Sequence, residues 1–305
     1  MSGLIPAKVT HYSRHDPDTS IGGVETFARN LRHVFSDVEF MWKRHRDVKK
    51  VEREGRMVIC DNQWAVDWPD RIPVVAFQHG VAAVKAERVG SRGIARMAKK
   101  QAKAAKRPNT IWVSNSQWVS DTFGQLHGNS AYQVIYYQVD LERFDGERPE
   151  VESDLVIHDA RGEHKGEEVV ARLKERAPDL RLEGLDCEPH QVADRMRRAR
   201  AFVHISRYEG NSIVCNEAMA MGLPCLVTDV GLFSDPNGPT EVQRMSAERA
   251  FTDDAYVESE VRSFLKRIET ETLNARPWVL EHASLEATRR NWARVHEHWR
   301  AALVR

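Results

Sequence analysis

The stretch His204–Asp229, HISRYEGNSIVCNEAMAMGLPCLVTD, contains the clearest structural pattern in this 305-residue sequence. The apolar run Ala201–Ile205 predicts a strand, and a polar loop then leads into a helix from about Ser212 to Met221. Gly222-Leu223-Pro224 supplies the glycine and proline that end helices, and Cys225–Thr228 predicts a second strand. Together they predict a strand–helix–strand unit of a parallel sheet.

Strands and helices alternate in the same way along the rest of the chain, which predicts an α/β fold with parallel sheets. Further strands are expected in the second half at Leu155–His158 and Arg181–Gly184, and helices at Glu167–Arg176, Gln191–Ala199, Ala255–Ile268 and Leu285–Ala302. In the first half we expect strands at Ala7–His11, Met57–Cys60, Val74–Phe77, Thr110–Val113 and Gln133–Ile135, and helices at Val24–Phe35 and Ile94–Arg107.

Length and composition indicate two globular domains. At roughly 100–200 residues per domain the chain holds two, and its 41% apolar and 30% charged residues exclude disordered, collagen-like and coiled-coil classes. We expect two Rossmann-like domains, over residues 1–145 and 151–285, joined by a linker at Asp145–Ser153. The final helix, residues 286–303, is expected to pack back on the first domain.

The sequence also bears on location. No run approaches the ~20 apolar residues of a membrane span, and the start lacks the apolar run of a signal peptide. The four cysteines lie far apart without a C-x-x-C pair, which favours reduced core thiols and a cytoplasmic protein. They are Cys60, Cys187, Cys215 and Cys225.

The predicted helix start near Ser212 points free backbone N–H groups and a favourable dipole at the carboxyl end of the sheet, which suits an anion. Glu209 precedes this helix and Glu217 lies inside it. A carboxylate can accept hydrogen bonds from two neighbouring hydroxyl groups. A phosphate flanked by two acceptors for hydroxyl groups fits a nucleotide-sugar, although each glutamate taken alone is equally compatible with an ordinary surface acid.

Glu209-Gly210-Asn211-Ser212 followed by Glu217-Ala218-Met219-Ala220-Met221-Gly222-Leu223-Pro224 resembles the signature E-G-x-[GS]-x-x-x-x-E-A-x-A-x-G-x-P. That signature belongs to the retaining GT-B glycosyltransferases of family 4, the "group 1" transferases. Other segments also resemble this family: Ile21-Gly22-Gly23-Val24-Glu25, Val113-Ser114-Asn115-Ser116, Val139-Asp140-Leu141-Glu142-Arg143-Phe144, Arg161 with Lys165-Gly166, and Pro277-Trp278-Val279-Leu280. The resemblance implies a GT-B fold, in which two Rossmann-like domains face each other across a cleft.

The resemblance also implies roles for single residues. Glu217 would hold the donor ribose and Glu209 a sugar hydroxyl, while Arg161 and Lys165 would neutralise the diphosphate. His79, in Gln78-His79-Gly80, aligns with the family histidine that faces the reacting sugar. The backbone around the donor would be supplied by Gly22, Gly23, Gly210, Asn211 and Ser212.

Two departures from the family pattern affect details of recognition. The spacing from Arg161 to Lys165 is one residue shorter than usual, and the usual Asn-Gly is Tyr137-Gln138 here. We see no D-x-D pair that would hold a divalent ion. We therefore expect neither a metal nor a cofactor beyond the nucleoside-diphosphate-sugar.

A basic run in the first half is a candidate acceptor surface. Lys85–Arg107 holds nine basic residues and one acid, although the 45 basic and 45 acidic residues of the chain cancel. Such a run is either a solvated helix face or a patch for an anionic surface, either lipid-linked phosphate or nucleic acid. The candidate acceptor residues are Arg96, Lys99, Lys100, Lys103 and Trp64.

The function favoured by the sequence is transfer of a sugar, with retention, from a nucleoside-diphosphate-sugar to an envelope glycan or lipid-linked acceptor, at the cytoplasmic side and with peripheral membrane attachment as an option. One alternative is a glycosyltransferase acting on modified bases in DNA. Another is a GT-B-like protein that binds a nucleotide or nucleic acid without catalysis.

Overall fold

A computed structural model describes residues 3–20, 22–42, 45–148 and 151–303. The chain divides into two compact units. The first comprises Met1–Gln138 with Leu285–Arg305, and the second comprises Val139–Ser284. The division therefore falls before the expected linker, because Val139 donates its backbone N–H to the carbonyl of Ala283, 2.9 Å away, within the second unit.

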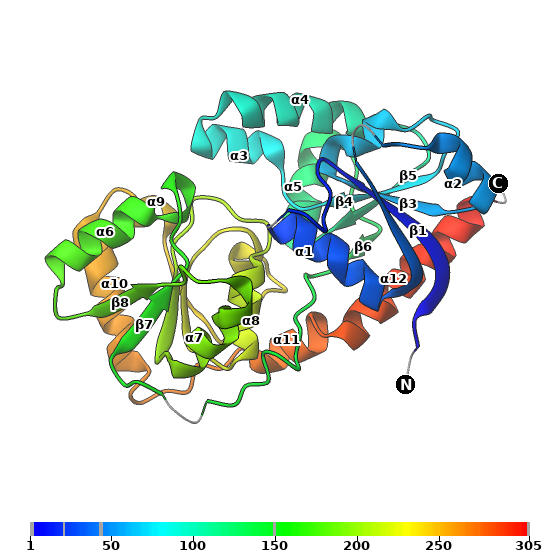
Figure 1. The fold of residues 1–305 in the computed structure, drawn as a ribbon. Helices are drawn as coiled ribbons and strands as arrows, with labels where there is room; N and C mark the ends of the chain where they lie inside the picture. Colours follow the sequence, from blue (N-terminus) through cyan, green and yellow to red (C-terminus); the bar gives the residue numbers. More distant parts are fainter. Residues whose placement is uncertain (1–2, 21, 43–44, 149–150, 304–305) are drawn as a thin grey trace. The chain divides into compact units, whose positions relative to one another are not determined.

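The first unit contains a six-stranded parallel sheet in the order β2-β1-β3-β4-β5-β6 (Figure 1). Its strands are β1 Ile5–Ser13, β2 Phe35–Trp42, β3 Met57–Asp61, β4 Val74–Gln78, β5 Thr110–Ser114 and β6 Gln133–Val134. The chain crosses from β1 to one side of the sheet and then returns to the other, so the order reverses between β1 and β3. Such a reversal marks where open α/β sheets bind ligands.

The helices of the first unit are α1 Gly23–Asn30, α2 Val48–Glu54, α3 Ala82–Val89, α4 Arg92–Ala105, α5 Gln117–His127 and α12 Leu285–Ala302, with short 3₁₀ turns at Leu31–His33 and Asn62–Asp67. The expected helix Val24–Phe35 is wrong at its end, because Phe35 begins strand β2. The sequence analysis missed β2 because it is an edge strand in which acids and partly buried side chains separate its two buried apolar residues, Phe35 and Met41.

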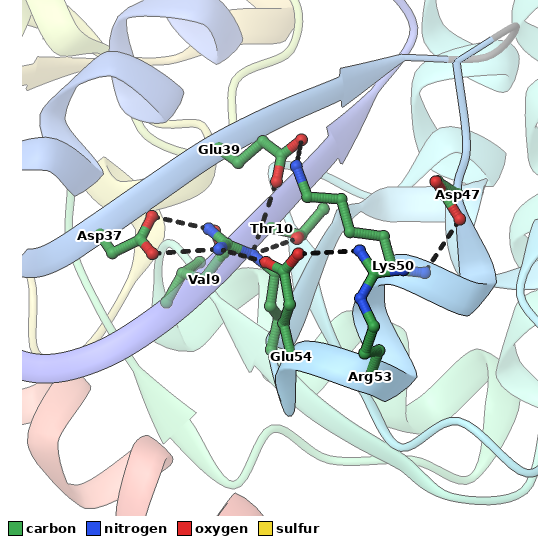
Figure 2. A network of polar contacts seen from close by, with 9 residues as sticks. Val9, Thr10, Asp37, Glu39, Asp47, Lys50, Arg53 and Glu54 are labelled. Carbon is green, nitrogen blue, oxygen red and sulfur yellow. Dashed lines mark hydrogen bonds and ion pairs between the residues drawn. The ribbon is translucent and has the colours of Figure 1, made fainter.

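A network of polar contacts joins the strands at this edge of the sheet, and Figure 2 shows the labelled partners Val9, Thr10, Asp37 and Glu54. Arg56 donates to the carbonyl of Val9 at 2.8 Å, to Thr10 Oγ1 at 3.0 Å and to both carboxylate oxygens of Asp37. It also donates to Glu54 at the end of α2. One guanidinium thus connects β1, β2, α2 and the start of β3.

Helix α12 covers the first unit after the chain has passed through the second (Figure 1). Trp292 is fully buried, with its ring 5.6 Å from that of Phe35 and 6.0 Å from that of Phe77. Trp299 donates its indole N–H to the carbonyl of Pro73. Both tryptophans are packing residues, as their helical spacing indicates.

The second unit contains a five-stranded parallel sheet in the order β11-β10-β9-β7-β8. Its strands are β7 Leu155–His158, β8 Arg181–Gly184, β9 Ala201–His204, β10 Cys225–Thr228 and β11 Gln243–Met245. Its helices are α6 Glu167–Arg176, α7 Val192–Arg198, α8 Ile213–Ala220, α9 Ala247–Ala250, α10 Asp254–Arg267 and α11 Arg276–His282, with 3₁₀ turns at Glu163–Lys165, Pro189–Gln191 and Gly231–Ser234. The order reverses between β7 and β9.

No helix in the described part of the chain is long and apolar enough to cross a membrane. All four cysteines are unpaired, and three of them are buried. The exception, Cys187, is partly exposed.

Candidate functional site

The loops that follow β7 and β9 form the reversal point of the second sheet, and polar side chains gather there. Lys165 follows β7 and Glu209 follows β9, and the Lys165 ammonium lies 3.1 Å from Glu209 Oε1. The same ammonium lies 3.6 Å from Asp159 Oδ2. Burial lowers the pKa of Lys165, but the carboxylates of Glu209 and Asp159 raise it by more, so the lysine is charged.

Backbone packing holds Lys165 against the end of β9. Gly166 has φ 69°, and a Cβ there would lie 2.9 Å from the carbonyl oxygen of Ile205, so only glycine fits. The carbonyl of His164 accepts hydrogen bonds from the backbone of Arg207 and from Ser206 Oγ. The Lys165 ammonium therefore projects from a loop fixed to both central strands.

Arg161 is not brought together with Lys165. Its guanidinium lies 3.5 Å from Asp186 and donates to the carbonyl of Leu185. The side chain is more than half exposed. Arg161 therefore reaches the loop after β8, and a role on a diphosphate requires it to change partners.

The Glu209 loop rests on the loop after β10. The backbone N–H of Leu232 donates to the carbonyl of Gly210 at 2.9 Å. Gly231 has φ 56°, and a Cβ there would lie 2.1 Å from the carbonyl oxygen of Glu209. This close contact fixes the position of the loop that carries Glu209 relative to the loop after β10.

Helix α8 begins beside Glu209 and carries Glu217. Ser212 caps it, its hydroxyl accepting from the backbone N–H of Cys215, and both Ser212 and Asn211 are buried. Burial raises the pKa of Glu217 to about 7, a shift that nearby Arg143 opposes. Glu217 is thus a partly buried carboxyl group that readily takes a proton or a hydroxyl hydrogen bond.

The glycines expected at the donor lie at the start of α1. Gly22 precedes the helix with φ 168°, which is extended backbone, and its carbonyl accepts from Thr26 N–H. Ile21, the first residue of the resembling segment, lies outside the described residues. Gly22 and Gly23 lie on the segment after β1, next to the reversal point of the first sheet.

His79 follows β4, and both of its ring nitrogens are engaged inside the first unit. Nε2 lies 2.8 Å from Asp61 Oδ1 and Nδ1 lies 2.5 Å from the hydroxyl of Tyr137. The same Asp61 oxygen lies 2.8 Å from His11 Nε2. Burial raises the pKa of Asp61, but His11 and His79 lower it by more, to about 2. The carboxylate therefore accepts hydrogen bonds from both imidazole rings.

The sequence analysis missed this network because no motif joins its members. Asp61 and His11 lie within or at the end of buried strands, and the only signal is a polar side chain in an apolar run. The prediction that His79 faces a sugar stays a prediction. A sugar that binds His79 Nδ1 has to displace the Tyr137 hydroxyl from it.

The basic run spans α3, α4 and the buried Arg107, and the candidate acceptor cations within it lie on α4. Arg96, Lys99, Lys100 and Lys103 are all exposed. Including Trp64 in this surface is wrong: it is 8% exposed and packs within the core of the first unit, because its turn folds under α4. Lys100 of this surface approaches it, with its ammonium 4.8 Å from the ring centre.

Comparison with protein-family models finds a match within the second unit. The sequence model of the family described as "Glycosyl transferases group 1" matches residues 148–252, which include Arg161, Lys165, Glu209 and Glu217. No curated protein sequence matches the chain.

Solved structures match nearly the whole chain. Sucrose-phosphate synthase from Thermosynechococcus elongatus has a TM-score of 0.73 at 14% identity, over 97% of this chain and 100% of that one. HepE from Anabaena in complex with UDP has a TM-score of 0.67 at 13% identity, over 95% and 100%. A glycosyltransferase from Rickettsia africae has a TM-score of 0.60 at 12% identity, over 97% and 99%. The chain has the GT-B fold of these glycosyltransferases.

Proposed function

We propose that this protein is a retaining glycosyltransferase that moves a sugar from a nucleoside-diphosphate-sugar to an acceptor. The observation that carries the proposal is the arrangement at the β7/β9 reversal point. There a charged lysine, the capped start of α8 and two glutamates lie within the segment that matches the group 1 transferases. Structures of HepE with UDP and with UDP-glucose add support for a nucleotide donor.

The proposed roles follow from the charge that develops in the reaction. The bond from the sugar to the diphosphate breaks as the bond to the acceptor oxygen forms, and negative charge grows on the leaving phosphate. Lys165 and the N–H groups at the start of α8 stabilise that charge, because preorganised donors act most strongly where charge develops. Arg161 joins them once it leaves Asp186, so that side chains rather than a metal ion stabilise the diphosphate.

The glutamates hold hydroxyl groups on either side of the diphosphate. Glu217 accepts from the ribose and Glu209 from the sugar, which orients the reacting carbon toward the acceptor hydroxyl. The acceptor hydroxyl attacks the reacting carbon directly, on the same face as the leaving group, so we assign no side-chain nucleophile. A phosphate oxygen of the leaving group takes the proton of that hydroxyl, so no side-chain base is needed.

The acceptor is proposed to be anionic, either a lipid-linked glycan or an envelope glycan, and to bind at the face of α4. The exposed cations Arg96, Lys99, Lys100 and Lys103 carry this part of the proposal. A DNA acceptor would show a steep loss of affinity with salt in the absence of lipid, whereas a lipid-linked acceptor requires the lipid.

A thermal-shift panel with UDP-, GDP-, ADP- and dTDP-sugars tests the donor site, because a ligand that binds only the folded state raises the melting temperature. We expect one nucleotide series to raise it and Lys165→Ala to abolish the rise. Transfer to an acceptor that is lost in folded Glu209→Ala and Arg161→Ala separates an enzyme from a non-catalytic binding protein. The absence of any shift across the panel would refute the proposal.

A further inference from the structure

Four charged side chains form a closed ring of alternating sign at the β7/β9 reversal point. Lys165 lies 3.1 Å from Glu209 and 3.6 Å from Asp159, as described above. Asp159 Oδ1 lies 2.7 Å from His204 Nδ1, and His204 Nε2 lies 3.9 Å from Glu209 Oε1. The ring is contained within the second unit.

The ring has an outer and an inner half. The Lys165 side chain is 29% exposed and that of Glu209 is 16% exposed, whereas Asp159 is 8% and His204 0% exposed. The proposed function uses Lys165 and Glu209 and leaves the inner pair without a role. A buried charge is costly unless it is paired, so Asp159 and His204 depend on each other.

The inner pair is ionised. Although burial raises it, His204 and Lys165 lower the pKa of Asp159 to about 2. Although burial lowers it, the carboxylate of Asp159 raises the pKa of His204 well above its usual value. Two cations and two anions then give a ring with no net charge.

We propose that His204 is a positioning residue for the donor diphosphate. By pairing with the carboxylate of Asp159, His204 leaves the Lys165 ammonium available to the phosphates. The inference rests on the proposed function of Lys165. Without a charge on His204, Asp159 and Glu209 would face one lysine, and the ring would carry a net negative charge. A diphosphate entering such a site would meet repulsion, and Asp159 would hold Lys165 more tightly.

Charge-changing variants separate this role from simple packing. His204→Gln keeps a hydrogen-bonding side chain of similar reach but removes the cation. Asp159→Asn removes the anion, and the double variant removes both and restores a ring with no net charge. Inorganic pyrophosphate, titrated by calorimetry into each folded variant, is the probe, because it contains the diphosphate without sugar or base.

We expect His204→Gln to weaken pyrophosphate binding about tenfold, which corresponds to about 1.4 kcal/mol. Asp159→Asn should bind at least as tightly as the wild type. The double variant should return to within about threefold of the wild type, since the opposite changes compensate. In transfer assays His204→Gln should raise the donor KM more than it lowers kcat.

Two outcomes would overturn the inference and leave the proposed function standing. In one, the wild type binds pyrophosphate and His204→Gln binds it equally well. In the other, the double variant binds pyrophosphate more weakly than either single variant. A wild type that binds neither pyrophosphate nor any nucleotide-sugar overturns the proposed function itself. If His204→Gln fails to fold, the ¹⁵N chemical shifts of the His204 imidazole in the wild type provide the test. The signal of His204 is assigned as the one that changes in Asp159→Asn. A doubly protonated ring at about pH 7.5 supports the inference, and a neutral ring overturns it.

Discussion

Glu217 is a partly buried carboxylic acid whose ionisation costs the folded protein stability. Its pKa is raised to about 7 by burial, whereas an unfolded chain ionises near 4.3. Between these values the folded state binds more protons than the unfolded state, so stability falls as pH rises through that window. A residue placed at a stability cost is a candidate for function.

Glu217→Gln should therefore raise the free energy of unfolding by about 2 kcal/mol at pH 8 and change it little near pH 4. Urea denaturation at both pH values measures this. The same variant should weaken donor binding, because the amide is a poorer acceptor for two hydroxyl groups than the carboxylate. Wild-type donor affinity should rise from pH 6 to pH 8, and a variant with the same pH profile would contradict the assignment.

A motif can single out a residue from the sequence, whereas residues that only the fold brings together carry no such signal. Lys165 and Glu209 were identified from their motif, and the structure joins them. Asp159 and His204 lie 45 positions apart and meet only because β7 and β9 are neighbours in the sheet. Trp64 was misassigned because an indole in a polar stretch has the same sequence signal whether it is exposed or buried.

Among the elements, those with strong periodicity were predicted closely. The expected bounds of α6, β7, β8, β10 and α12 are those of the structure. The sequence analysis missed two strands, β2 and β11, and five helices, α2, α3, α5, α9 and α11. Both strands lie at sheet edges, and every one of these helices except α5 has eight residues or fewer, so neighbouring elements rather than local pattern stabilise them.

The edge strand β2 depends on Arg56, whose buried guanidinium bonds β1 and Asp37 of β2. Arg56→Ala should lower the free energy of unfolding by about 3 kcal/mol, because it leaves buried acceptors unpaired. Arg181 is a matched control: it also contacts three acids but is exposed. Arg181→Ala should cost much less, because an exposed ion pair contributes little to stability. Equal losses in urea denaturation would contradict this account.

The loop after β10 should control the Glu209 loop through Gly231. Gly231→Ala places a methyl group against the Glu209 carbonyl, so the loop must move. We expect a donor KM raised at least about fivefold and a stability loss of about 2 kcal/mol. Gly55→Ala is the control, since Gly55 has φ 61° with open space around it. It should share the backbone strain but leave KM unchanged; a KM that rises equally in both would refute the contact.

At the scale of the whole molecule, the chain leaves the first unit after Gln138 and returns at Leu285. The spacing of Trp292 and Trp299 indicated that the last helix packs on a partner surface, since apolar side chains on one helix face need one, but it did not indicate which unit supplies that surface. The returning helix makes the stability of the first unit depend on residues that follow the second unit in the sequence, whereas the second unit is continuous.

Trp292→Ala should therefore destabilise one unit selectively. Removing a fully buried indole that packs on Phe35 and Phe77 should cost about 3–5 kcal/mol. Hydrogen exchange read by mass spectrometry should show faster exchange throughout β1, β4 and β6, with β7 to β10 unchanged. Trp278→Ala, in the second unit, is the control and should give the reverse pattern. A bound donor nucleotide should stabilise the second unit more than the first, because Lys165, Glu209 and Glu217 lie there, so the thermal unfolding of Trp292→Ala should separate into two transitions whose spacing grows with donor concentration. Uniform loss of protection across both units would show that the two unfold as one.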